Sequence, residues 1–246
     1  MTSSDHHDTT RIEGFSDAVF GFAVTLLVVS LEVPRSYDDM RAAMRMLPAF
    51  AASFALLLLV WQEHRTFFKR FGTDDGPLLW LNGALLFTVL AYVYPLKFLM
   101  NLLLGPDGFL AGGIPSGVRE EDVPQLMVMY GLGFVALFAV LACMHFRALA
   151  VHRRHGASAE TLRDIRVHGG ASLVYVAIGL ASVLVALVGR TGLAMGLSGG
   201  LYALTGPAHV LYHRVVVPRL YRGAAAPMVR EQRPVKGRRA GRRGTA

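Results

Sequence analysis

Long apolar segments constrain this chain more than any other feature, because they have the length needed to cross a lipid bilayer. Six runs of about 20 residues, enough to span a hydrocarbon core, contain few charged side chains. A water-soluble fold would expose much of this apolar surface, and only 17% of the residues carry charge. The sequence therefore predicts an all-α membrane protein with six transmembrane helices. The predicted spans are residues 15–33, 44–62, 78–100, 124–144, 169–188 and 193–211.

The segments outside these spans predict the orientation of the protein in the membrane. Most Lys and Arg residues fall on one side, which the positive-inside rule assigns to the cytoplasm together with both termini. We expect a polar N-terminal segment at 1–10, a membrane domain at 11–218 and a disordered basic tail at 219–246. Such a tail favours contact with anionic lipid headgroups over nucleic acid. The four-residue connection 189–192 contains two glycines and predicts a tight helical hairpin.

The first predicted span carries the most informative pattern in the sequence. A carboxylate at Asp17, about one turn inside the span, is costly unless it is paired or hydrogen-bonded. At about 100° per residue, Phe22, Leu26 and Val29 form one apolar stripe, with Thr25 at its edge and Asp17 roughly 140° away. An apolar stripe usually faces lipid or another helix, so the residues alone leave this interpretation open beside a pore-lining one.

Motif residues in the first three predicted spans carry a resemblance to a known family. They are Arg11, Phe15, Ser16 and Asp17 in the first span, Trp61, His64, Arg65 and Phe68 near the end of the second, and Leu79, Trp80, Leu81 and Asn82 at the start of the third. Together these residues resemble the transmembrane protein 175 family of lysosomal and bacterial potassium-permeable channels. The match is strong over about the first hundred residues and extends to the rest through the number of spans and the charge of the loops.

The resemblance implies a homotetramer of six-helix subunits around a central pore lined by the first helix. Pores of this family lack the Thr-Val-Gly-Tyr-Gly filter, which this sequence also lacks. Their constriction is formed by bulky apolar side chains five, nine and twelve residues after the motif aspartate, which here are Phe22, Leu26 and Val29. Phe22 departs from the family, which usually has an aliphatic residue there, and a ring of four phenylalanines would be bulkier.

The resemblance also implies a network that anchors the first helix. It assigns this role to Arg11, Phe15, Ser16 and Asp17, with candidate partners Trp61, His64 and Asn82. We favour this architectural role over direct ion coordination. Thr25 is expected to offer a polar group inside the pore, although a threonine hydroxyl on a helix can instead bond back to its own backbone.

The predicted function is thus a potassium-permeable cation channel in a prokaryotic plasma membrane. Its expected partners are potassium ions, the bilayer and further copies of the chain. The alternative is a proton-coupled secondary transporter that uses Asp17 and a histidine. No paired carboxylates within a span and no motif of a serine or zinc hydrolase are found, so we expect neither an enzyme nor a bound cofactor.

Histidines are the remaining candidates for a metal site. His209 and His213 lie four residues apart, a spacing that places two metal ligands on one helix face. No third ligand is evident near them, so we predict no metal site and interpret both as residues at the membrane interface. His152, His155 and His168 accompany arginines in a predicted cytoplasmic segment, where contact with solvent or headgroups is expected.

Overall fold

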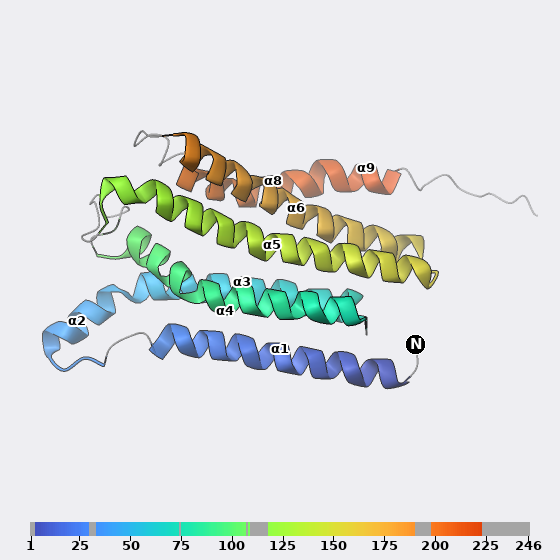
Figure 1. The fold of residues 1–246 in the computed structure, drawn as a ribbon, viewed down its shortest axis with the longest axis horizontal. Coiled ribbons are helices and arrows are strands. Elements are labelled where there is room, and N and C mark those ends of the chain that lie inside the picture. Colours follow the sequence, from blue (N-terminus) through green and yellow to red (C-terminus); the bar gives the residue numbers. More distant parts are fainter. Residues whose placement is uncertain are drawn as a thin grey trace, which may run out of the picture.

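Antiparallel helices run the length of the molecule in the computed structural model (Figure 1). The structure describes residues 3–29, 33–73, 75–106, 108, 118–189 and 198–222. Its long helices are α1 (Ser3–Val29), α3 (Leu47–Phe71), α4 (Gly76–Leu104), α5 (Val123–Arg154) and α6 (Ala159–Val188). A short helix, α2 (Tyr37–Arg45), precedes α3, and a 3₁₀ turn, η2 (Glu120–Asp122), precedes α5. The predicted all-α class is confirmed.

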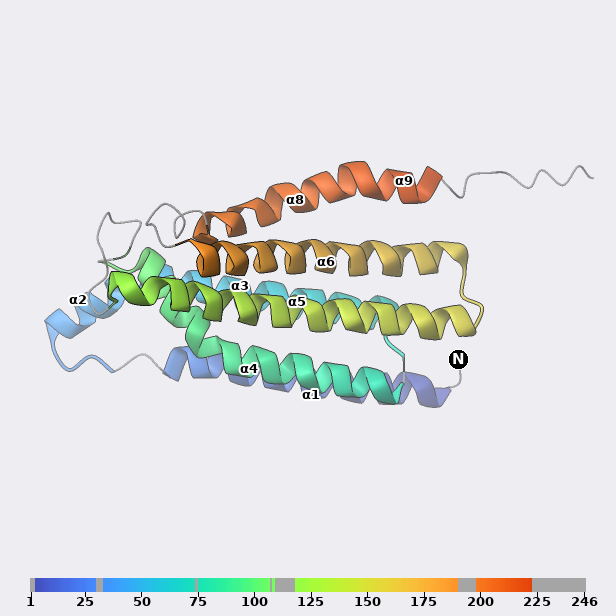
Figure 2. The same cartoon turned by 45° about the horizontal axis from the view of Figure 1, so that its top comes forward.

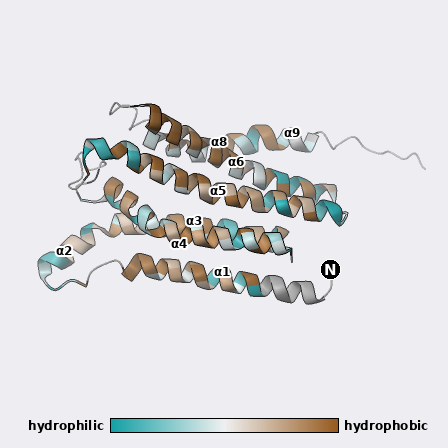
Figure 3. Cartoon of the chain, viewed as in Figure 1, coloured by the Kyte–Doolittle hydropathy of each residue, from teal (hydrophilic) through white to brown (hydrophobic). Residues whose placement is uncertain are grey.

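Five of these helices are long and apolar enough to cross a membrane. In α1 the apolar part is Arg11–Val29, and the other four are α3 to α6 over their whole lengths. Figure 3 shows apolar residues along the helix shafts, whereas hydrophilic residues gather at helix ends and at the turn between α5 and α6. The helices are longer than the predicted spans because their end turns carry polar residues, which a search for apolar runs leaves out.

The sixth predicted span has a less regular form than the other five. A continuous helical run over 198–222 passes through η3 (Leu201–Leu204), α8 (Thr205–Leu211), the π-helical η4 (Tyr212–Val216) and α9 (Val217–Arg222). Figure 2 shows this run lying along α6. The predicted boundary at 211 and the predicted disorder of 219–222 are therefore wrong. The start of this span at 193, the hairpin from 190 onward and the tail beyond 222 lie outside the described residues.

Local signals explain where the first half of the chain departs from the predicted boundaries. Of the predicted polar segment 1–10, residues 3–10 form the first part of α1 rather than a separate element. The sequence predicts the second span at 44–62, but a capping box at Ser36 and Asp39 starts α2, and Pro48 in the first turn of α3 starts a new helix at Leu47. Charged residues near its end do not stop α3, which continues to Phe71.

The arrangement of the helices brings alternate connections to the same end of the bundle. The start of α1, the α3–α4 and α5–α6 turns and the end of α9 lie together, at the right of Figure 1, and α2 lies at the opposite end. Helices α1, α3, α4, α5 and α6 contribute to one apolar core. The most extensive helix contact is between α5 and α6, where a Cβ on Gly131 would collide with the Val183 side chain.

Candidate functional site

A buried hydrogen-bonded chain joins α1, α3 and α4. His64 Nε2 on α3 lies 2.7 Å from the Asn82 side-chain oxygen on α4. Asn82 Nδ2 donates to Ser16 Oγ at 3.0 Å, and Ser16 Oγ donates to the Ile12 carbonyl oxygen at 2.8 Å within α1. Ser16, His64 and Asn82 are 0%, 1% and 1% exposed, respectively. The three polar side chains therefore satisfy one another inside an apolar bundle, where an unpaired polar group would be costly.

Helix periodicity explains why Ser16 reaches this site. On α1 the buried positions are Ser16, Phe20, Ala23 and Leu27, which repeat every three or four residues and form the face that packs on α3 and α4. The His64 ring lies between Phe20 and Phe68, with ring centroids at 5.5 and 4.8 Å. Because the Asn82 oxygen only accepts, His64 Nε2 carries the proton in this arrangement.

A second hydrogen bond fixes α1 to α3 near the surface of the subunit. Trp61 Nε1 donates to Asp17 Oδ1 at 2.7 Å. The Arg65 guanidinium lies 5.5 Å from the centroid of the Trp61 ring, within the range of a cation–π contact. Asp17 thus uses its carboxylate to accept from a neighbouring helix, and a hydrogen bond to an ionised acceptor is stronger than one between neutral groups.

Two of the predicted anchoring residues lie apart from these contacts. Phe15 is 64% exposed and points away from the core, and Arg11 is exposed near the start of the apolar part of α1. Within the described ranges neither side chain makes a hydrogen bond or an ion pair. The structure therefore brings together five of the seven predicted residues, namely Ser16, Asp17, Trp61, His64 and Asn82.

The predicted constriction residues occupy a different face of α1. Phe22 and Val29 are 58% and 72% exposed, while Leu26 is half-buried and touches the edge of the core. Thr25 is exposed, and its hydroxyl donates to the Gly21 carbonyl oxygen at 3.0 Å. No part of the described subunit covers Phe22 or Val29, so lipid or another copy of the chain has to cover this face of α1.

Comparisons with known proteins agree with the motif residues. Residues 11–92 match the family model described as the endosomal/lysosomal potassium channel TMEM175. A protein from Marivirga tractuosa named potassium channel is 36% identical over 214 residues, covering 84% of this chain and 87% of that protein. This chain belongs to the TMEM175 family. The resemblance carried by the motif residues is thereby confirmed.

Further TMEM175-type proteins support the assignment. A protein from Chamaesiphon minutus, also named potassium channel, is 31% identical over 126 residues, or 48% of this chain and 62% of that protein. The crystal structure of a variant of the potassium channel MtTMEM175 is 35% identical and superposes with a TM-score of 0.74 over 85% of this chain and 93% of that one. The named family and relatives are ion channels, which are not enzymes.

One ion pair between helices was missed in the sequence. Asp75, just before α4, accepts from Arg147 on α5 through Nε at 2.6 Å and Nη2 at 2.8 Å. This two-point contact lowers the pKa of Asp75, chiefly through the hydrogen bonds from Arg147. It connects the α3–α4 turn to α5. Asp75 and Arg147 are 72 residues apart, and such a pairing across the bundle leaves no local sequence signal.

The structure adds a feature of the histidines that the sequence did not predict. His168, His209 and His213, predicted to contact solvent or headgroups, lie together with His145 around a cavity between helices. Among the residues that the structure describes, no three His, Cys, Asp or Glu side chains are arranged to hold a metal ion. The cavity is on the far side of the core from the exposed stripe of α1 and is considered separately below.

Proposed function

We propose that this chain is a potassium-permeable cation channel whose pore is lined by four copies of α1 in a homotetramer. The observation that carries the proposal is the exposed apolar stripe on α1, with Phe22 and Val29 uncovered in the isolated subunit. Exposure alone is compatible with lipid contact. Membership in a family with named potassium channels favours contact with other copies around a pore.

The proposed pore discriminates ions without a ring of backbone carbonyls. Phe22, Leu26 and Val29 repeat along one face of α1, so four copies would place three apolar layers around the axis. An apolar constriction gates by dewetting, and an ion that crosses it sheds part of its hydration shell. Potassium holds its water less tightly than sodium, which gives such a constriction a preference for potassium. Thr25 adds a hydroxyl lone pair between these layers, although its proton is bonded to Gly21.

The polar chain behind α1 would keep the pore helix in position. Ser16 and Asp17 lie on the side of α1 opposite the stripe. Asp17 accepts a hydrogen bond from Trp61 on α3, and Ser16 accepts one from Asn82 on α4. Ions therefore do not need to contact Asp17, whose carboxylate already accepts from Trp61. This division favours an anchoring role for Asp17 over the proton-carrying role that a coupled transporter would require.

We further propose that the channel lies in a plasma membrane with both termini in the cytoplasm. The clustered basic residues at the end of the bundle that holds the start of α1 and the end of α9 support this orientation under the positive-inside rule. In this arrangement residues 11–218 form the membrane domain, α9 extends its last helix, and the basic chain beyond it lies at the cytoplasmic face.

Ion flux through purified protein in liposomes tests the function directly. Wild-type protein is expected to pass potassium faster than sodium without a counter-ion gradient. Phe22→Ala widens the proposed constriction and is expected to raise the flux of both ions and reduce the potassium preference. Phe87→Ala is the matched control, because Phe87 is an exposed phenylalanine on α4, at 72%, and is expected to leave flux unchanged.

Two results would contradict the proposal. Flux that depends on a proton gradient and disappears in Asp17→Asn, with assembly intact, would indicate a coupled transporter. Equal effects of Phe22→Ala and Phe87→Ala would mean that Phe22 contacts only lipid. Native mass spectrometry of the purified protein checks the assembly separately, with four copies of the 26.8 kDa chain expected.

A further inference from the structure

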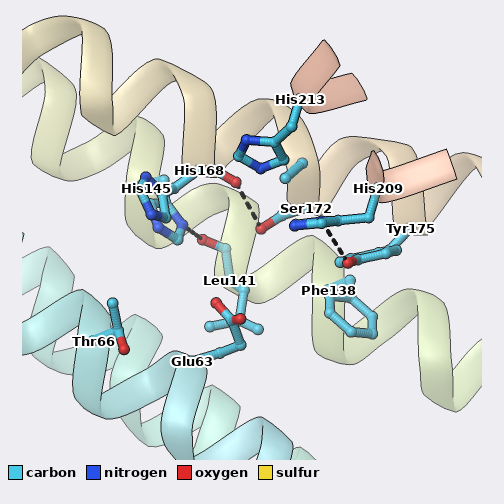
Figure 4. A pocket seen from close by; sticks show the side chains of 11 residues that line it. Glu63, Thr66, Phe138, Leu141, His145, His168, Ser172, Tyr175, His209 and His213 are labelled. Atoms are coloured by element: carbon cyan, nitrogen blue, oxygen red, sulfur yellow. Dashed lines mark hydrogen bonds between the residues drawn. The ribbon is translucent and has the colours of Figure 1, made fainter. Parts of the chain in front are cut away.

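A cavity of about 190 Å³ lies between α3, α5, α6 and the C-terminal helical run, away from the stripe on α1 (Figure 4). We call it the histidine pocket. Its polar lining is Glu63 and Thr66 on α3, His145 on α5, His168, Ser172 and Tyr175 on α6, His209 on α8 and His213 on η4. Phe138, Leu141 and Ala171 complete the wall. One water molecule occupies roughly 30 Å³ in the liquid, so the cavity has room for a few waters or one small ligand.

The hydrogen bonds already made by two histidines determine what they offer to a ligand. His145 Nδ1 lies 2.8 Å from the Leu141 carbonyl oxygen, and His168 Nδ1 lies 2.9 Å from the Asp164 carbonyl oxygen. A carbonyl only accepts, so each Nδ1 carries the proton, and each Nε2 of the neutral rings is an acceptor. Within the described residues neither Nε2 has a hydrogen-bond partner.

Glu63 supplies a negative charge to the same pocket. It is an exposed carboxylate in the membrane-spanning part of α3 and points toward the histidines in Figure 4. In the described part of the chain it makes no ion pair and no hydrogen bond. An ionisable side chain at this depth is costly without a partner and indicates a functional site. Among the described residues that line the pocket there is no Arg or Lys, so the pocket offers this carboxylate to a cation from outside the subunit.

We propose that the histidine pocket binds a primary ammonium group. The carboxylate of Glu63 and the Nε2 atoms of His145 and His168 would accept its N–H protons, and the rings of Phe138 and Tyr175 would provide aromatic walls for a cation. These groups come from α3, α5 and α6, and the C-terminal run closes the pocket, where a 2.8 Å hydrogen bond joins Tyr175 to His209.

The chemistry of the acceptors separates an ammonium ion from other cations. Imidazole nitrogen accepts N–H hydrogen bonds well but is a poor ligand for potassium, which prefers oxygen. A transition metal would favour imidazole, but it needs ligands at about 2.0–2.2 Å, and no three side chains among the described residues are arranged to hold a metal ion. Hydrogen bonds from an ammonium group are longer, about 2.7–3.2 Å, and so accept more widely spaced acceptors. A quaternary ammonium has no N–H group and would leave the acceptors unpaired.

The depth of the pocket allows two sources of this group. Glu63 lies about 12 Å from the end of α3 at Phe71, and His145 about 14 Å from the end of α5 at Arg154, at 1.5 Å per residue. With its 32 residues, α5 extends about 9 Å beyond each side of a hydrocarbon core about 30 Å thick. The pocket therefore lies near the headgroup boundary, within reach of a soluble amine or of a phosphatidylethanolamine headgroup.

Thermal unfolding of the purified full-length protein in detergent tests the proposal. Methylammonium chloride is expected to raise the melting temperature in a saturable way at pH 8, whereas tetramethylammonium chloride and potassium chloride at equal concentration do not. Glu63→Gln and, separately, His168→Asn are expected to weaken the apparent affinity by about tenfold to a hundredfold, the loss typical of a hydrogen bond to a charged group. Two variants are used so that one failure to fold does not end the test.

His155→Asn is the matched control. His155 has the same Nδ1 contact with a backbone carbonyl, to Val151 at 2.8 Å, but is exposed at the end of α5 outside the pocket. This variant is expected to bind methylammonium like the wild type. Stabilisation that is equal for the three salts, or a methylammonium response that survives in both pocket variants, would overturn the proposal.

Lipid nanodiscs distinguish the two sources. If a headgroup fills the pocket, phosphatidylethanolamine stabilises the wild type more than phosphatidylcholine does, Glu63→Gln removes the difference, and methylammonium adds nothing in phosphatidylethanolamine. If the source is a soluble amine, the two lipids give equal stability and methylammonium stabilises the protein in both. Either pattern supports a primary ammonium site, and neither depends on whether the protein conducts potassium.

Discussion

Replacing Asn82 with leucine tests whether the buried polar chain holds α1 in place. Asn82 accepts from His64 and donates to Ser16, so the change removes two hydrogen bonds between helices and leaves the His64 N–H buried without an acceptor. An unsatisfied buried donor costs about 1–3 kcal/mol. Measured side-chain couplings inside a membrane protein average about 0.6 kcal/mol and reach about 1.7. Since two bonds are lost at once, we expect Asn82→Leu to lower the free energy of unfolding by about 2 kcal/mol.

A double-mutant cycle separates the hydrogen bond from the packing. His64→Phe keeps a ring between Phe20 and Phe68, where the centroid distances are 5.5 and 4.8 Å. The double variant with Asn82→Leu leaves no unsatisfied His64 donor, so it should cost no more than Asn82→Leu alone. His64→Phe alone leaves the Asn82 oxygen without its donor and should cost about 1 kcal/mol. The losses of the two single variants therefore exceed that of the double variant by about 1 kcal/mol, which is the coupling energy between the two sites.

Unfolding of the purified protein by SDS titration measures these free energies. Thr88→Ala is the control on the same helix, because the Thr88 hydroxyl donates to the Ala84 carbonyl oxygen within α4 at 2.8 Å. This variant is expected to lower the free energy of unfolding by less than about 0.5 kcal/mol. Additive losses in the cycle would refute the reasoning, since they would mean that His64 and Asn82 contribute through packing rather than through their hydrogen bond.

Two further variants test how the helices are held together. Asp75→Asn should destabilise the protein at neutral pH, because Arg147 lowers the pKa of Asp75 in the folded state. The carboxylate therefore stabilises the fold at pH values above its unfolded pKa of about 3.9. This stabilisation is lost as the pH falls through the lower pKa of the folded state. Thermal unfolding at several pH values should show the wild type and Asp75→Asn converging in acid. Gly131→Ala, which would press a Cβ on Val183, should cost about 1–3 kcal/mol, whereas Gly83→Ala, in open space, should not destabilise the protein.

These variants have clear contrary outcomes. A difference between wild type and Asp75→Asn that stays constant down to the acid limit would mean that the carboxylate charge is not the stabilising feature. If Gly131→Ala proved as stable as Gly83→Ala, the α5–α6 contact would have room for a methyl group and would be looser than the structure indicates.

Much of the fold could be predicted because each span leaves a strong local signal. The face of α1 that carries Ser16 followed from the 100° turn per residue, and the same geometry separated Phe22 from Asp17. Helix ends were less predictable. A polar last turn, such as the one that ends at Phe71, continues a helix beyond its apolar run. Pro48 starts a new helix within a segment whose composition alone predicts one continuous span.

The histidines show where sequence reasoning reaches its limit. His209 and His213 share a helix face, so their proximity was predictable, and their ring centroids are indeed 4.5 Å apart. Their meeting with His145 and Glu63 was not, because these residues lie far apart in the chain on helices whose mutual rotation depends on packing throughout the bundle. The same limit applies to Asp75 and its distant arginine.

The direction of the buried polar chain has a consequence for acid conditions. From His64 through Asn82 and Ser16 to the Ile12 carbonyl, every proton points the same way, toward α1. Adding a second proton to the imidazole would occur at Nδ1 and leave the Nε2–H bond to Asn82 in place. That second N–H would be buried between Phe20 and Phe68, where no acceptor among the described residues is found for it, so the packing opposes the charged ring. The chain therefore holds α1 through neutral hydrogen-bonding groups, and this attachment does not rely on a charge at His64.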